Sequence, residues 1–198
     1  SHVVLNLETD QVEEFIVIGV TDEKGKEPKT LYEGEVIFVD QTVDLAYVCP
    51  AVEDGVFTHF FERSRVPAYE TTPFGKEVFV MGFPAAGEGT ITISPGHIVG
   101  FIDGPKVENW IGVPDLDSER LQLYKTDALA GPGSSGGMLV DKDLNLIGVP
   151  FAGSLFPGAF LFSLSEDVYV GFEKRVQTSL HAQGLVPPDC VYDWESQY

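Results

Sequence analysis

The sequence predicts an all-β fold, either a sandwich or a barrel. The chain of 198 residues contains 21 Gly and 13 Pro, and short runs of Val, Ile and Phe alternate with turn residues along it. Short apolar runs separated by turns favour antiparallel strands over the longer crossovers of a parallel α/β sheet. With 43% hydrophobic residues, the chain can bury one substantial core or two small ones.

Nine segments have the length and composition of strands. The segment Asp141 to Asp143 predicts a tight turn between two of them. From residue 73 onward the strands suffice for a complete six-stranded barrel, whereas those before residue 73 do not, and an incomplete barrel leaves an unpaired strand edge. The predicted strands are Phe15 to Val20, Thr30 to Val39, Leu45 to Val48, Glu77 to Gly82, Thr90 to Ile102, Leu121 to Thr126, Met138 to Val140, Leu144 to Phe151 and Ala159 to Ser163.

One helix is predicted after the last strand. The segment Ser163 to Glu166 fits a capping box, and apolar residues then recur at four-residue spacing up to an expected end at Gly184. The tail Leu185 to Tyr198 is expected to be extended. The apolar residues of the helix are Val168, Phe172, Val176 and Leu180.

The segment Tyr124 to Val140 reads YKTDALAGPGSSGGMLV and places Ser135 among glycines. A serine hydroxyl in such a turn can act as a nucleophile, and the amides of Gly133 and Ser135 can form an oxyanion hole. Glycines at 131, 133, 136 and 137 allow the chain to fold tightly enough to turn these amides inward. By itself the motif also fits an ordinary polar turn.

Two further segments carry the other residues of a catalytic triad. His2 begins the segment His-Val-Val, and Asp44 begins Asp-Leu-Ala-Tyr-Val, so that the order is His, Asp, Ser. The segments SHVV, DLAYV and TDALAGPGSSGGML resemble those of the trypsin-like serine proteases, and most closely those of the HtrA/Deg branch. The segment Val78 to Ile102 resembles a hairpin of the same family, so the likeness extends from residue 2 to about residue 170.

This resemblance implies two six-stranded antiparallel barrels followed by a C-terminal helix. The family places strands ahead of the histidine, so the N-terminal barrel is expected to be truncated or completed by another segment. The implied organisation is a partial barrel over residues 1–72, a complete barrel over 73–164, and a helix with an extended tail over 165–198. We expect no peptide-binding PDZ domain after the tail.

The resemblance also implies the role of each site residue. His2 is the expected general base, Asp44 the carboxylate that orients it, and Ser135 the nucleophile. The expected primary pocket is apolar, which predicts cleavage after a small or medium apolar residue because a basic side chain would be desolvated without a partner. The residues of this pocket are Leu129, Phe151 and Ala159.

Each assignment has an alternative. Asp44 also fits a turn residue, and Ser-His at the start of a chain is also what a purification tag leaves. Ser134 is the alternative nucleophile; digestive proteases carry at its position an aspartate that pairs with a newly cut N-terminal ammonium, so that activation switch is absent. Asp127 is interpreted as structural. The remaining histidines, interpreted as structural or surface residues, are His59, His97 and His181.

Two other functions fit part of the pattern. Gly-Ser-Ser-Gly-Gly also satisfies the nucleophile elbow of α/β-hydrolase esterases, and Ser135, Asp167 and His181 follow the order of that fold. The elbow requires a helix after the serine, however, whereas Met138 to Val140 predicts a strand. The other alternative is a catalytically inactive, protease-like binding module.

Charge and cysteine content limit the partners. The net charge is −19 with only 12 Lys and Arg, which argues against nucleic acid as a partner. The resemblance to serine proteases implies a protein or peptide substrate. No run is long and apolar enough for a membrane span, and no cofactor or metal site is expected. Cys49 is interpreted as a buried apolar residue and Cys190 as an exposed thiol, although one bridge is possible.

Overall fold

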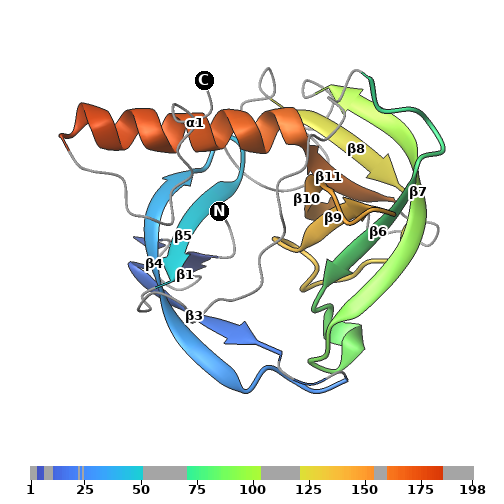
Figure 1. Cartoon of the computed structure of the whole chain (residues 1–198), viewed down its shortest axis with the longest axis horizontal. Coiled ribbons are helices and arrows are strands. Elements are labelled where there is room, and N and C mark those ends of the chain that lie inside the picture. The colour runs from blue at the N-terminus through green and yellow to red at the C-terminus, as the bar shows by residue number, and fades with distance from the viewer. Residues whose placement is uncertain are drawn as a thin grey trace.

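The computed structural model describes residues 4–6, 11–21, 23, 25–50, 71–103, 121–153 and 160–184. These residues form strands and one long α-helix (Figure 1). The strands are β1 (Leu5–Asn6), β2 (Gln11–Val12), β3 (Phe15–Val20), β4 (Thr30–Asp40), β5 (Leu45–Pro50), β6 (Glu77–Gly82), β7 (Thr92–Asp103), β8 (Gln122–Thr126), β9 (Met138–Asp141), β10 (Leu146–Gly153) and β11 (Leu161–Ser165); the helix is α1 (Glu166–Ala182), and a short 3₁₀ helix spans Ala85–Gly87.

The strands after residue 73 close into a six-stranded barrel, as the sequence predicts. Its strands follow one another in the order β10, β11, β8, β7, β6 and β9, and every pair is antiparallel. Apolar side chains fill its interior, because alternate residues of each strand point inward. This interior core includes Val78, Val80, Ile98, Leu139 and Ile147.

The N-terminal strands form two smaller sheets. Strands β3, β4 and β5 form one antiparallel sheet, and β1 pairs with β2 in another. Within the described residues, only the C-terminal strands form a closed barrel. The side chains of Phe15 and Val17 are exposed on the edge strand β3, at 46% and 71%.

Helix α1 begins later than the sequence predicts. Its N-cap is Ser165, and no side chain makes a capping hydrogen bond, so the capping box expected from Ser163 is wrong. Strand β11 continues through this segment, where Ser163 pairs with Tyr124 and Ser165 with Gly148. Pairing with both neighbouring strands satisfies the backbone groups and keeps this segment extended.

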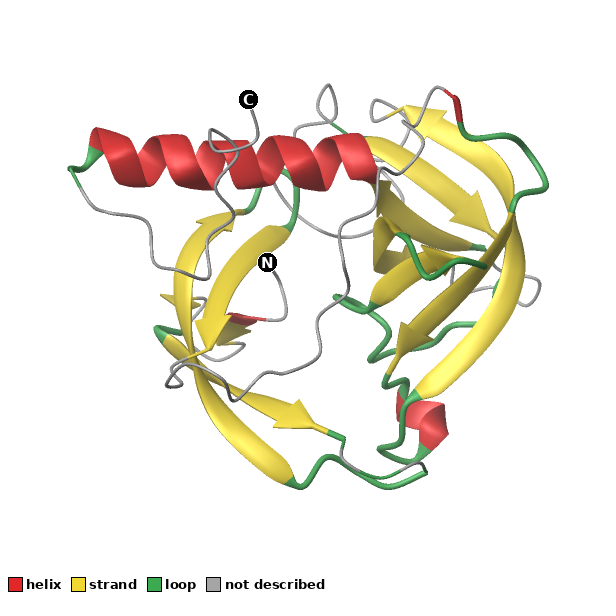
Figure 2. Ribbon diagram, viewed as in Figure 1, coloured by secondary structure: helices red, strands yellow, loops and turns green. Residues whose placement is uncertain are grey.

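Helix α1 joins the two halves of the molecule (Figures 1 and 2). One hydrophobic core contains residues from the N-terminal sheet, from the outer face of the barrel and from the helix. The hydroxyl of Tyr169 also donates to the carbonyl of Leu146 at 3.0 Å. The members of this shared core include Val43, Leu45, Phe162, Leu164, Val168, Phe172, Val176 and Leu180.

Cys49 corrects one expectation. Its side chain is buried, with 6% exposure, but it is disulfide-bonded and is therefore not a simple apolar core residue. Cys190, the other cysteine of the sequence, lies outside the described residues. Disulfide formation depends on the spatial distance between two Cα atoms, which sequence spacing alone does not give.

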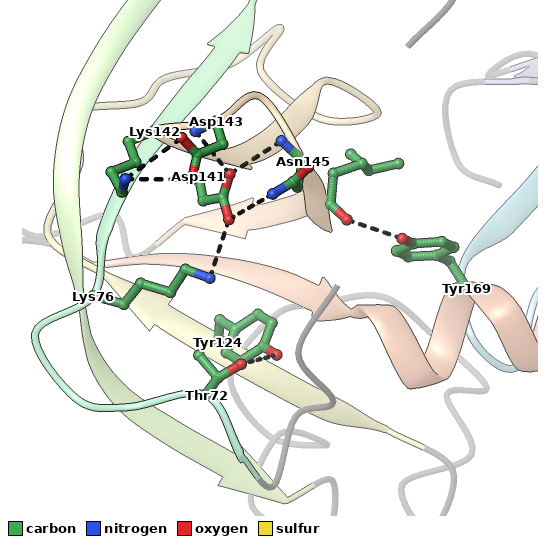
Figure 3. Close-up of polar contacts among 9 residues, drawn as sticks. Thr72, Lys76, Tyr124, Asp141, Lys142, Asp143, Asn145 and Tyr169 are labelled. Carbon is green, nitrogen blue, oxygen red and sulfur yellow. Dashed lines mark hydrogen bonds and ion pairs between the residues drawn. The ribbon is translucent and has the colours of Figure 1, made fainter. Parts of the chain in front are cut away.

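A buried carboxylate closes the turn between β9 and β10 (Figure 3). The Asp141 carboxylate accepts hydrogen bonds from the Asp143 amide at 3.0 Å and from the Asn145 amide and side chain, each at 3.1 Å. Lys76 completes the group, with its Nζ 3.2 Å from the Asp141 carboxylate. Burial raises the pKa of Asp141, but these contacts outweigh it and hold that pKa below its ordinary value of 3.8.

We expect Lys76→Met to lower the free energy of unfolding by about 2–3 kcal/mol at pH 7, because it leaves a buried carboxylate without its cation. Since the folded-state pKa is depressed, the stability contributed by Asp141 is complete above about pH 4 and lost as the pH falls through the folded value. The free energies of unfolding of the variant and the wild type should therefore differ less at pH 3.5 than at pH 7. Urea denaturation at both pH values measures this difference, and a difference that does not depend on pH would contradict this account.

Candidate active site

The loop that carries Ser135 connects β8 to β9 and is folded by its own backbone. The Ser134 amide donates to the Gly131 carbonyl at 3.0 Å, and the Gly137 amide donates to the Ser134 carbonyl at 3.1 Å. Gly133 has a φ of 94° and Gly136 a φ of 76°, a region that side chains disfavour. The sequence predicts this tight glycine turn, and the structure contains it.

The same loop rests on the segment that follows β6. The Ala85 amide donates to the Pro132 carbonyl at 2.7 Å. A Cβ at Gly133 would lie 2.5 Å from the Phe83 carbonyl oxygen, and one at Gly137 would lie 2.4 Å from that of Met81. Backbone therefore occupies the space of a side chain at both glycines. The sequence resemblance includes this segment, but it gives no sign that its backbone supports the loop.

The two adjacent serines have different surroundings. Ser134 is 3% exposed, and its hydroxyl accepts a hydrogen bond from the Gly131 amide at 3.3 Å. Ser135 is half-buried, and its hydroxyl donates to the Phe151 carbonyl at a long 3.3 Å. Ser135 is therefore partly accessible to solvent, whereas the Ser134 hydroxyl is buried and hydrogen-bonded within the turn.

The amides of the loop divide into two groups. The Ser134, Gly136 and Gly137 amides each donate to a carbonyl, that of Gly136 to Pro150 at 2.8 Å. Within the described part of the chain, the Gly133 and Ser135 amides make no such hydrogen bond. Two unbonded donors beside a partly accessible serine are what a carbonyl oxygen that gains negative charge requires.

Asp44 lies in the N-terminal half, at the end of the turn between β4 and β5. It is 4% exposed, and its neighbours Val43 and Leu45 are buried in the shared core. Its φ of 54° is in the left-handed region, which aspartate adopts more often than most non-glycine residues, mainly in turns. His2, the expected base, lies outside the described residues.

The expected pocket residues are placed differently from one another. Leu129 is 84% exposed and lies on the same connection as Ser135. Phe151 buries its side chain in the shared core and presents its backbone carbonyl to Ser135. Ala159 lies outside the described residues.

Among the described residues, no hydrogen bond or ion pair joins Asp127, His97 or His181 to Ser135. The Asp127 carboxylate accepts a hydrogen bond from the His97 amide at 2.6 Å, which ties the start of the loop to β7 and agrees with a structural role. His97 and His181 are both exposed, as the sequence predicts.

The esterase alternative is wrong for this fold. The segment after Ser135 is strand β9, not the helix that a nucleophile elbow requires. The other residues of that alternative, Asp167 and His181, are both exposed on α1.

Within the described ranges, no group of three His, Cys, Asp or Glu side chains could hold a metal ion. The helices described are also too short or too polar to cross a membrane.

Comparison with known proteins identifies the family of the chain. The family model of the trypsin-like peptidase domain matches residues 1–149. HhoB of Synechocystis sp., described as a serine protease, is 27% identical over 120 residues, which are 61% of this chain and 26% of HhoB. The chain thus spans about a quarter of the length of this relative.

Solved structures share the fold. The inactive form of a serine-to-alanine mutant of Rv3671c from M. tuberculosis H37Rv has a TM-score of 0.60 at 22% identity, over 76% of this chain and 67% of that chain. The HtrA-type protease AlgW with a decapeptide has a TM-score of 0.61 at 18% identity, over 88% of this chain and 54% of that chain. The family match covers more than half of the sequence, and the neighbours include HtrA-type proteases. The chain therefore belongs to the trypsin-like peptidase family of serine protease hydrolases.

Proposed function

We propose that this chain is a serine endopeptidase with Ser135 as its nucleophile. The observation that carries the proposal is the half-buried Ser135 hydroxyl in a turn where the Gly133 and Ser135 amides are unbonded. Attack of this hydroxyl on a peptide carbonyl places negative charge on the carbonyl oxygen. Two preorganised N–H donors stabilise that charge.

In this proposal His2 accepts the Ser135 proton and later donates it to the leaving amine. Asp44 binds the other ring nitrogen, holds the tautomer and stabilises the imidazolium. The family match, which begins at residue 1 and so includes His2 and Asp44, supports these roles. The burial of Asp44 supports them further, because its charge then acts in a low dielectric. Water then hydrolyses the acyl-enzyme on Ser135, with His2 again as the base.

Labelling with a fluorophosphonate tests the proposal directly. This reagent reacts with a serine that a base has activated, so the expected product is a single adduct on Ser135, identified by peptide mass spectrometry. Ser134→Ala should still be labelled, whereas Ser135→Ala should not. An adduct on Ser134, or no adduct on a folded chain, would overturn the assignment, and the latter result would favour the inactive binding module.

We further propose that the enzyme cleaves after small or medium apolar residues. The pocket in this proposal is the one that the sequence resemblance implies, at Leu129, Phe151 and Ala159, and none of these residues is charged. A Lys or Arg side chain bound there would lose its hydration without gaining a carboxylate partner, at about several kcal/mol. We therefore expect Val, Ala or Leu before the cleaved bond.

Profiling with a peptide library measures this preference, with position-matched Lys and Arg peptides as the control. Dominant cleavage after Lys or Arg would contradict the proposed pocket and would indicate that an acidic loop residue, such as Asp115 or Asp117, reaches it.

A further inference from the structure

The turn that carries Asp44 is organised by a second aspartate, Asp40, at the end of β4. One carboxylate oxygen of Asp40 accepts hydrogen bonds from the Thr42 amide, at 3.1 Å, and from the Thr42 hydroxyl. The Val43 amide donates to the Asp40 carbonyl at 3.3 Å, and the Asp44 amide donates to the Gln41 carbonyl at 3.2 Å. The Asp40 side chain thus fixes the start of the turn that ends at Asp44.

The other carboxylate oxygen of Asp40 binds an arginine from the far end of the sequence. Nε of Arg175 lies 3.2 Å from Asp40 Oδ2, and its Nη2 lies 3.1 Å from the same oxygen. The Asp40 side chain is only 12% exposed and that of Arg175 is 38% exposed, so the pair is partly shielded from water. One carboxylate oxygen of Asp40 is therefore bonded within the turn, and the other contacts helix α1.

Aromatic contacts also join helix α1 to the strands beside this ion pair. One turn before Arg175, Phe172 packs against Phe38 and Tyr47, with ring centroids 5.8 and 6.4 Å apart. These two aromatic residues belong to β4 and β5, the strands that flank the turn. The helix therefore packs against the two strands that flank the turn, and Arg175 lies on this packed part of the helix.

The position of the Asp44 carboxylate depends on the turn around it. Asp44 has a left-handed φ of 54°, a conformation that aspartate adopts more readily than most residues, as a single residue in a turn. The anchored side chains of Val43 and Leu45 restrain the chain on both sides, and Asp40 restrains the beginning of the turn. Releasing one restraint would allow the Asp44 carboxylate to move by fractions of an ångström without unfolding the core.

We propose that Arg175 is a positioning residue for the peptidase reaction. It holds Asp40, which in turn holds the turn that presents the Asp44 carboxylate to the base. This inference rests on the proposed function, in which Asp44 orients His2. The C-terminal helix would then affect catalysis indirectly, because Arg175 contacts Asp40 and not the reacting groups.

Arg175→Met should therefore lower kcat about 10- to 100-fold with little change in KM. Misplacing a catalytic group by a small distance has effects of this size, and they stay below the ~10⁴-fold loss expected when the acid itself is removed. Arg175→Lys keeps the charge but not the rigid planar guanidinium whose Nε donates to Asp40, so we expect a smaller loss of about three- to tenfold. Both variants retain Phe172 and the rest of the packed helix.

The experiment measures kcat, KM and the rate of fluorophosphonate labelling for each variant, well below its unfolding temperature. Lys76→Met is the matched control, since it removes another shielded ion pair, with 3.2 Å between Lys76 and Asp141, in a different part of the fold. It should lower the melting temperature and leave kcat within about twofold, whereas Arg175→Met should lower both.

A double mutant separates positioning from stability. In an Asp44→Asn background, Arg175→Met should cause no further loss of kcat while still lowering the melting temperature. A kcat of Arg175→Met within twofold of wild type, or an additive loss in that background, would overturn the positioning role alone. An unchanged kcat in Asp44→Asn would overturn the proposed role of Asp44, and the positioning role of Arg175 with it.

Discussion

Replacing Ser135 with alanine is expected to lower peptidase kcat by roughly 10⁶-fold, the effect of removing the nucleophile of a catalytic triad. In the proposed mechanism this hydroxyl forms the covalent bond to the substrate, and we do not expect the adjacent serine to replace it. The Ser134 hydroxyl is buried and accepts a hydrogen bond from the Gly131 amide. The measurement is the turnover of a peptide selected from the library, at an enzyme concentration high enough to detect a roughly 10⁶-fold lower kcat.

Two controls make the result specific. The free energy of unfolding of Ser135→Ala should lie within about 1 kcal/mol of the wild-type value. The reason is that the Ser135 hydroxyl makes only a long hydrogen bond, of 3.3 Å, to the Phe151 carbonyl in a half-buried position. Ser134→Ala removes a hydroxyl of the same kind from the adjacent position and should retain measurable turnover. Equal losses in the two variants would show that the loop conformation, rather than the Ser135 hydroxyl, had been tested.

Most strands of the fold could be predicted from the sequence because their patterns are strong. The bounds of β3 and β6 agree with the expected Phe15 to Val20 and Glu77 to Gly82, where apolar runs end at turn residues. Strands β1 and β2 have two residues each, which is too short for any pattern. The sequence predicts the helix start too early because Ser163 fits a cap, whereas strand pairing, which is not visible in the sequence, keeps Ser163 in β11.

In the candidate site, too, the local features could be predicted from the sequence and the long-range contacts could not. The glycine turn around Ser135 is local, so its sequence predicts its shape. Asp40 and Arg175 are 135 positions apart, and no motif connects them. An acidic residue before a turn and an arginine on an amphipathic helix are ordinary surface features when read separately. Only the fold, which packs α1 against β4 and β5, brings these two residues into contact.

Asp44→Asn is expected to lower kcat about 10⁴-fold, because an amide in place of the carboxylate favours the wrong imidazole tautomer. Asparagine has nearly the same volume and tolerates left-handed φ values, so the turn with a φ of 54° at residue 44 should persist. The large effect therefore comes from charge and hydrogen bonding, not from strain. The measured quantities are kcat and the melting temperature, and a parallel collapse of both would mean that the turn had been lost.

The pH dependence of kcat/KM gives Asp44 a second, independent test. In the wild type, kcat/KM should rise with pH through an apparent pKa of about 6.5 to 7, since a neutral His2 must accept the Ser135 proton. A nearby carboxylate stabilises the imidazolium and raises that pKa. Removing its charge in Asp44→Asn should therefore move the rise to lower pH, while the plateau stays far below that of the wild type. A profile that keeps the wild-type midpoint would show that Asp44 does not face the base, and a flat wild-type profile from pH 5 to 8 would remove His2 from the mechanism.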